Sequence, residues 1–194
     1  MKLRLFFALW PDAPVRAALA AAAMPLRQAC AGRPVEPRNY HLTLAFLGGV
    51  EAAQLADIRT AAATVRAPAF QLVMDCHGHW PKPRVAWLGS RRPPPTAGVL
   101  AARLWQALEP LGFAAEQRPF RPHLTVLRNC RRCDWPGPVA AVDWRVRDFV
   151  LVSSVTLPSG PRYEVLARWP LERGEGNCDV PAKNGPCSAG PDVK

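Results

Sequence analysis

The four residues His41-Leu42-Thr43-Leu44 occur a second time, with a single change, as His123-Leu124-Thr125-Val126. Successive side chains of a β-strand point to opposite faces, so the histidine and threonine of each copy share one face and the two aliphatic residues share the other. We call residues 41–44 the first motif and residues 123–126 the second motif. Two such strands side by side predict a cleft lined by two imidazoles and two hydroxyl groups, with a hydrophobic core behind it.

The two motifs lie 82 positions apart, and each is on a predicted strand that follows a predicted helix. Asp12 is expected to cap the first helix and Gly32 to end it, and Gly48-Gly49 are expected to end the strand of the first motif. Apolar periodicity predicts strands over 3–9, 40–47, 70–80, 84–88, 120–127, 145–156 and 162–169, and helices over 13–30, 51–65 and 96–111. The repeated order predicts an internal duplication, with two lobes related by a pseudo-twofold axis across the cleft.

Length, charge and hydropathy narrow the class of protein. The 194 residues suffice for one domain, expected over 1–171, and the polar stretch 172–194 is predicted to be a disordered tail. The formal charge is +10, and nearly all basic residues are arginine, which favours a polyanion such as RNA; a GC-rich genome would give the same bias. The apolar run that begins at Leu3 stops at Pro11-Asp12, so we expect neither a membrane span nor a signal peptide, and a cytoplasmic protein.

The six cysteines form no compact framework, and reduced thiols are expected. Cys130 and Cys133 make a CxxC pair. A structural zinc site would need a second pair of ligands, for which only the widely separated Cys178 and Cys187 remain. The sequence therefore predicts no metal and no cofactor.

Two histidines and two threonines suit the hydrolysis of a 2′,3′-cyclic phosphate at the end of an RNA chain. Near pH 7 a neutral imidazole can take a proton from water, and a protonated one can give a proton to the departing ribose oxygen. Thr43 and Thr125 would donate hydrogen bonds to the phosphate oxygens. This chemistry requires no metal ion.

The chain resembles the 2H phosphoesterases, and within them the bacterial and archaeal RNA 2′,3′-cyclic phosphodiesterases, historically called 2′-5′ RNA ligases. The resemblance covers roughly residues 4–169. It depends on Arg4-Leu-Phe-Phe-Ala8, on residues 39–48 around the first motif, and on residues 118–128, Arg-Pro-Phe-Arg-Pro-His-Leu-Thr-Val-Leu-Arg. It implies a bilobal α/β (α+β) fold, in which two antiparallel-rich sheets face each other across a central cleft with the helices outside, and a 2′-phosphomonoester as product.

The resemblance also implies a role for each site residue. His41 is implied as the proton donor to the 3′ oxygen and His123 as the proton acceptor that activates water. Arg128 is implied to lie near the phosphate, although strict alternation places it on the face opposite His123. Phe6 and Phe46 are candidates for stacking on a base, and the alternative is that they belong to the core.

Several arginines and two more histidines are candidates for binding or structural roles. Arginines on the predicted loops that lead into the two motif strands are candidates for guiding an RNA backbone, and solvated surface is the alternative: Arg33, Arg38, Arg118 and Arg121. His77 and His79 lack an accompanying threonine and are expected to have a surface or strand-edge role.

Two other functions stay open. The same two proton transfers run in reverse would join RNA ends through a 2′-5′ linkage, and a non-catalytic RNA-binding module would use the basic cleft alone. The expected partner is RNA with a 2′,3′-cyclic phosphate end, with tRNA fragments as one possibility, and the protein is expected to be a monomer.

Overall fold

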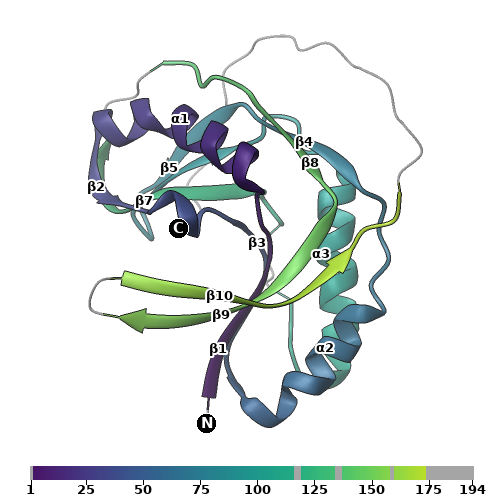
Figure 1. Cartoon of the computed structure of the whole chain (residues 1–194). Helices are drawn as coiled ribbons and strands as arrows, with labels where there is room; N and C mark the ends of the chain where they lie inside the picture. Colours follow the sequence, from purple (N-terminus) through teal and green to yellow (C-terminus); the bar gives the residue numbers. More distant parts are fainter. Residues whose placement is uncertain (1, 116–118, 134–136, 158–159, 174–194) are drawn as a thin grey trace.

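A computed structural model describes residues 2–115, 119–133, 137–157 and 160–173 (Figure 1). The strands of the described residues are β1 (Lys2–Leu9), β2 (Cys30–Pro34), β3 (Leu42–Glu51), β4 (Phe70–Met74), β5 (Cys76–Trp80), β6 (Val85–Gly89), β7 (His123–Cys133), β8 (Val142–Val146), β9 (Asp148–Leu157) and β10 (Gly160–Pro170). The helices are α1 (Ala13–Ala29), α2 (Leu55–Ala63) and α3 (Pro95–Leu108), with short 3₁₀ segments at Pro37–Asn39, Ala52–Gln54 and Glu109–Leu111. The predicted mixed fold is confirmed.

Most strands belong to one sheet, in which they follow the order β10-β9-β1-β3-β7-β6-β5, and β2 pairs with β7 outside this path. All of these pairings are antiparallel. The halves β10-β9-β1-β3 and β7-β6-β5 are joined by a single residue pair, Leu42 with Leu124. The two predicted lobes therefore meet inside the larger sheet, at the strands that carry the two motifs. A second sheet consists of β4 and β8 alone.

The helices share one large hydrophobic core with the sheet. α1 contacts β2, β7 and β8, whereas α2 packs on α3, and α3 packs on β3 (Figure 1). Leu19 of α1, Ile58 of α2 and Leu104 of α3 are fully buried in this core together with Leu42 and Leu124. All three helices thus cover the face of the sheet on which the aliphatic residues of the motifs lie.

Helix ends follow local chemistry in part. The Asp12 side chain accepts a hydrogen bond of 3.0 Å from the backbone N–H of Val15, so the predicted cap of α1 is confirmed. Gly32 does not end this helix. α1 stops at Ala29, and the next residues pair with β7 as the short strand β2, which includes Cys30, expected at the helix end, and Arg33, expected in a loop.

Gly48 and Gly49 do not end the strand of the first motif, which continues to Glu51. Gly48 has a φ of 73°, a conformation open to glycine, at a point where the register of β3 on β1 shifts. The strand bends there and keeps its partner, since Gly48 pairs with Leu5 and Gly49 with Arg4.

Two predicted strands are each divided into two. Residues 70–80 break at Asp75, whose carboxylate accepts a hydrogen bond of 2.8 Å from the N–H of Arg91. Residues 145–156 break near Arg147, whose carbonyl accepts a hydrogen bond from the N–H of Leu171. Both breaks move the chain from the small sheet to the large one, without a glycine or proline to signal it.

At the end of the described chain, Glu172 is still held by the fold. Its N–H donates to the carbonyl of Ala67, and its carbonyl accepts from the N–H of Ala69. The rest of the predicted tail, residues 174–194, lies outside the described residues. Within the described ranges, no helix combines the length and apolar character that crossing a membrane requires.

Candidate active site

The two motifs lie next to each other on one face of the large sheet. Leu42 pairs with Leu124, and both are fully buried, as are Leu44 and Val126 apart from at most 4% of their surface. His41, Thr43, His123 and Thr125 are half-buried on the opposite face. The alternation predicted for each motif is therefore confirmed, and the single pair between β3 and β7 brings the two histidines and two threonines together.

Both catalytic candidates are oriented by the same backbone interaction. Nδ1 of His41 donates a hydrogen bond of 2.7 Å to the carbonyl of Asn39, and Nδ1 of His123 donates one of 2.8 Å to the carbonyl of Arg121. A carbonyl can only accept, so these bonds place the proton of each neutral ring on Nδ1. In both histidines Nε2 is then the nitrogen that can exchange a proton with a substrate.

Arg128 shares the face of His123 because β7 contains a bulge. Trp87 of β6 pairs with Thr125, but the next residue back, Ala86, pairs with Leu127, so Val126 is an extra residue. Val126 and Leu127 both point into the core, and alternation resumes with Arg128 on the side of Thr125. The positive charge of Arg128 lowers the pKa of His41, as expected for two groups on the same face of the sheet.

A bulge at the equivalent place in β3 does the same for Phe46. Phe7 pairs with Ala45 and Ala8 with Thr43, which leaves Leu44 as the extra residue. Phe46 is therefore on the face of Thr43, is 42% exposed, and has the guanidinium carbon of Arg4 4.9 Å from its ring centroid. Of the two candidates for base stacking, Phe46 thus offers an exposed ring.

Phe6, the other candidate, is 4% exposed, and its ring centroid lies 4.8 Å from that of His41. Trp10 stacks on the same imidazole at 5.6 Å with an interplanar angle of 11°, and Tyr163 meets it edge-on at 5.2 Å. These rings belong to a small second cluster on the face of the sheet that carries the motif histidines, formed by Phe6, Ala8, Val150 and Val152 with Trp10 and Tyr163 packed against them. Phe6 therefore supports His41 in this structure.

The sequence interpretation missed the aromatic residues around the two histidines. Trp10 continues the alternation of Phe6 and Ala8, and this pattern alone could have placed it on the cleft face. Tyr163 belongs to β10 and Trp80 to β5. The Trp80 ring lies edge-on to His123, with the ring centroids 4.5 Å apart. Neither could be found without the order of strands in the sheet.

The surroundings of His41 favour its neutral form. Burial lowers its pKa from 6.5 to about 4, the charges of Arg128 and His123 act in the same direction, and the hydrogen bond to the carbonyl of Asn39 opposes them. At pH 7 the imidazole of His41 is therefore neutral in the free protein.

The remaining candidates are dispersed. The Arg121 side chain is exposed, and it is the backbone carbonyl of this residue that holds His123. Arg33 reaches the β9–β10 hairpin, because a Cβ on Gly160 would lie 2.9 Å from its Nη2. Arg38 belongs to the 3₁₀ segment before the first motif, and Arg118 lies outside the described residues.

The two other histidines have structural partners. Nε2 of His77 donates a hydrogen bond to the carbonyl of Gly137, and Nε2 of His79 donates one to the carbonyl of Cys130.

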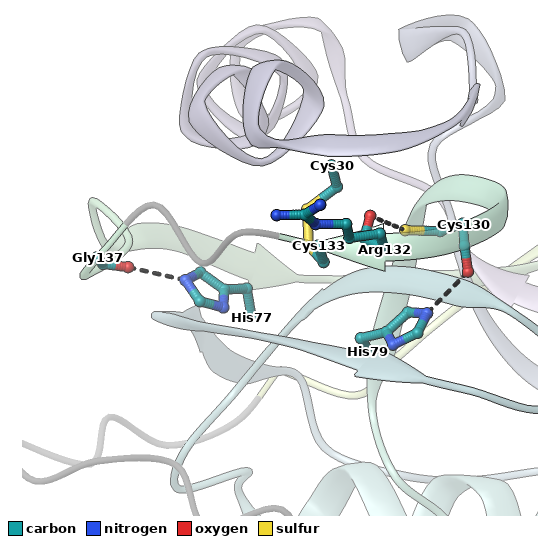
Figure 2. The surroundings of a disulfide bond; sticks show 7 residues. All are labelled: Cys30, His77, His79, Cys130, Arg132, Cys133 and Gly137. Atoms are coloured by element: carbon teal, nitrogen blue, oxygen red, sulfur yellow. Dashed lines mark hydrogen bonds between the residues drawn. A yellow bond between two sulfur atoms is a disulfide. The ribbon is translucent and has the colours of Figure 1, made fainter.

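The cysteines depart from expectation. Cys30 and Cys133 form a disulfide, so the prediction of reduced thiols is wrong for this pair in the structure (Figure 2). The two cysteines are 103 residues apart, so local spacing in the sequence could not indicate that they pair. Cys178 and Cys187 lie outside the described residues. Among the residues described, Cys30, Cys130 and Cys133 are the one group of three or more side chains close enough to hold a metal ion.

Comparisons with known proteins identify relatives of this chain. Residues 9–87 match a family model described as LigT like Phosphoesterase. An RNA 2′,3′-cyclic phosphodiesterase of Escherichia coli strain K12 is 39% identical over 142 residues, which cover 73% of this chain and 81% of that protein. A protein of the same name from Thermus thermophilus is 35% identical over 190 residues, covering 89% and 92% of the two chains.

The fold has solved counterparts as well. The crystal structure of E. coli LigT complexed with 3′-AMP superimposes with a TM-score of 0.81 at 36% sequence identity. The match covers 88% of this chain and 99% of that one. The likeness therefore takes in nearly all of the described chain.

Proposed function

Because this chain belongs to the LigT-like phosphoesterase family, we propose that it hydrolyses 2′,3′-cyclic phosphate ends of RNA, with His41 and His123 as its proton-transfer groups. The observation that carries the proposal is the pairing of Leu42 with Leu124, which sets the two motifs side by side on one face of the sheet. Relatives at 35–39% identity bear the name of this activity.

The proposed reaction needs one group on each side of the phosphorus atom. Nε2 of His123 takes a proton from water as the water oxygen bonds to phosphorus. Nε2 of His41 gives a proton to the 3′ oxygen as the bond between that oxygen and phosphorus breaks, which leaves a 2′-phosphomonoester. The hydroxyl groups of Thr43 and Thr125 and the guanidinium of Arg128 stabilise the charge on the phosphate oxygens. No step of this scheme uses a metal ion.

The low pKa of His41 makes substrate binding part of the mechanism. With a pKa of about 4, roughly one His41 ring in a thousand is protonated at pH 7 in the free protein. A phosphodiester anion in the cleft favours the imidazolium form, because an opposite charge nearby raises the pKa of a histidine. The donor is therefore charged by the arrival of the substrate that it protonates.

The proposal extends to the source of the substrate, the oligomeric state and the location of the protein. Exposed Phe46 and the arginine-rich surface suit an RNA end, and tRNA fragments are the proposed source of such ends. All groups of the proposed reaction come from a single chain, which supports an active monomer. We place the enzyme in the cytoplasm, where RNA fragments arise.

The test uses pure protein and an oligonucleotide that ends in a 2′,3′-cyclic phosphate. The wild type should leave the phosphate on the 2′ hydroxyl, which is established by the chemical position of the phosphate in the product. His41→Ala and His123→Ala should each lower kcat by roughly 100- to 10,000-fold, the usual share of a general acid or base. Both variants should still bind the oligonucleotide.

His77→Ala is the matched control, because this histidine lies outside both motifs and bonds the carbonyl of Gly137. It should retain turnover. The proposal is wrong if both motif variants turn over the substrate like the wild type, and retention of RNA binding without any turnover in the wild type would leave only a binding module. Turnover that persists in excess EDTA supports a chemical step without a metal ion. Loss of turnover in EDTA contradicts the metal-independent mechanism.

A further inference from the structure

We propose that the reduced form of the Cys30, Cys130 and Cys133 cluster binds one thiophilic divalent cation of the Zn²⁺ type, at a structural site separate from the histidine cleft. The three Sγ atoms lie within 4.8 Å of one another. A tetrahedral zinc ion with Zn–S bonds of about 2.3 Å needs sulfur atoms about 3.8 Å apart. The sulfurs of Cys30 and Cys133 must therefore separate once their disulfide is reduced, and no pair has to approach by more than about 1 Å. Figure 2 shows Cys130 and Cys133, at the end of β7, with Cys30 of β2.

Cys130 is the residue that a disulfide alone does not explain. A pair of cysteines completes a disulfide, yet the third is fully buried beside it. Its thiol donates a hydrogen bond of 3.4 Å to the carbonyl of Arg132, inside the CxxC segment. A bound cation replaces the proton of a buried thiol and uses its sulfur as a ligand.

The fold places Cys130 by backbone interactions that do not depend on the other two cysteines. Its N–H donates a hydrogen bond of 2.9 Å to the carbonyl of Arg84. Its carbonyl accepts a hydrogen bond of 2.9 Å from Nε2 of His79 (Figure 2). Asn129 just before it has a φ of 54°, where the pairing of β7 with β2 is irregular. These contacts preorganise the third ligand.

Gly32 makes room for this arrangement. A Cβ at this position would lie 3.2 Å from both Cα and Cβ of Cys130 and 3.1 Å from the carbonyl oxygen of Arg128. The absence of a side chain lets β2 approach the irregular part of β7 closely, and this approach brings Cys30 to the CxxC pair. A glycine predicted to end a helix thus serves the packing of the cluster.

Charge and access also fit a cation. Three thiolates and a divalent cation carry a net charge of −1, and Arg131 and Arg132 stand between the two cysteines of the CxxC pair. Cys133 is only half-buried, so an ion can enter from its side, and solvent can supply the fourth ligand.

The electron and proton balance is simple. Opening the Cys30–Cys133 disulfide takes two electrons and two protons from a dithiol, which itself becomes a disulfide. The cation then displaces the three thiol protons and forms three metal–sulfur bonds without further oxidation or reduction.

The test uses the full-length chain with Cys178→Ser and Cys187→Ser in every sample, so that thiols outside the described residues cannot contribute. Reduced, metal-free protein is titrated with Cd²⁺, and the thiolate-to-metal charge-transfer band is recorded in the ultraviolet. We expect one ion per chain, and competition by Zn²⁺. Cys130→Ser should weaken binding at least about tenfold, since removal of a group that merely supports a ligand already costs roughly 10- to 100-fold.

Cys76→Ser is the matched control, because Cys76 is buried and outside the disulfide, and it should bind Cd²⁺ unchanged. A second measurement avoids variants of the cluster: Zn²⁺ should slow alkylation of Cys30, Cys130 and Cys133 together in the reduced chain, and leave Cys76 unaffected. Absence of stoichiometric binding overturns the proposal, as does a Cys130→Ser chain that binds as tightly as its parent. Both readouts are independent of turnover, so this result and the test of phosphodiesterase activity stand apart.

Discussion

Replacement of Trp10 by alanine should raise the pKa of His41. The imidazole is desolvated by the rings of Phe6, Trp10 and Tyr163, and the drop of its pKa from 6.5 to about 4 corresponds to about 3.4 kcal/mol. Burial is the largest cause of the drop, and the charges of Arg128 and His123 act against the hydrogen bond to Asn39. If these opposing effects cancel, an equal share for each ring assigns Trp10 a change of about 0.8 in the pKa of His41, or about 1 kcal/mol. Loss of the stacked indole opens one face of the ring to water, which stabilises the charged form.

The assay is an NMR titration of the imidazole Cε1–Hε1 signals, with the His41 signal assigned from its absence in His41→Ala. Trp80→Ala is the matched control, because this indole contacts His123 instead. We expect a pKa near 4 in the wild type and in Trp80→Ala, and near 5 in Trp10→Ala. A wild-type value near 6.5, or an equal rise in both variants, would refute the desolvation argument.

Three further predictions concern the same site. First, the pKa of His41 is about 4 in the folded protein and 6.5 in the unfolded chain, so the unfolded chain binds more protons between these pH values. The free energy of unfolding should therefore fall by up to about 3 kcal/mol as the pH is lowered from 6.5 to 4. Urea titrations should show this fall in the wild type and not in His41→Gln. Second, Arg128→Met should raise the pKa of His41 in the NMR titration and raise KM, whereas Arg145→Met on β8 should change neither. Third, Phe46→Ala should weaken binding of an RNA end by about 1–3 kcal/mol in fluorescence anisotropy, and Phe46→Trp should restore it; equal affinity in both variants would exclude base stacking.

Local alternation predicted the central part of the site correctly. The repeated His-x-Thr-x pattern assigns His41 and Thr43 to one face and the aliphatic residues to the core, and the structure agrees because the extra residue of each bulge, Leu44 or Val126, comes only after the threonine. The α-helices were also found, since their apolar residues recur with helical period and Asp12 supplies a cap.

Other features depend on partners that are distant in sequence. Residues 70–80 are predicted as one strand, because the residues that hold Asp75 at the break, Gly89 and Arg91, are distant in sequence. Cys30 could not be joined to Cys133 before β2 was known to lie against β7. The position of Arg128 came from the family resemblance alone, since alternation predicts the wrong face until the bulge at Val126 is taken into account.

The extra residues Leu44 and Val126 decide which side chains after each motif lie beside the histidines. Phe46 stands five positions after His41, and Arg128 five positions after His123; on regular strands these odd intervals would turn each pair to opposite sides. The extra residue is what returns Phe46 and Arg128 to the side of the histidines. If either strand paired without its bulge at the present length, Phe46 or Arg128 would turn toward the core, while His41 and His123 would stay in place.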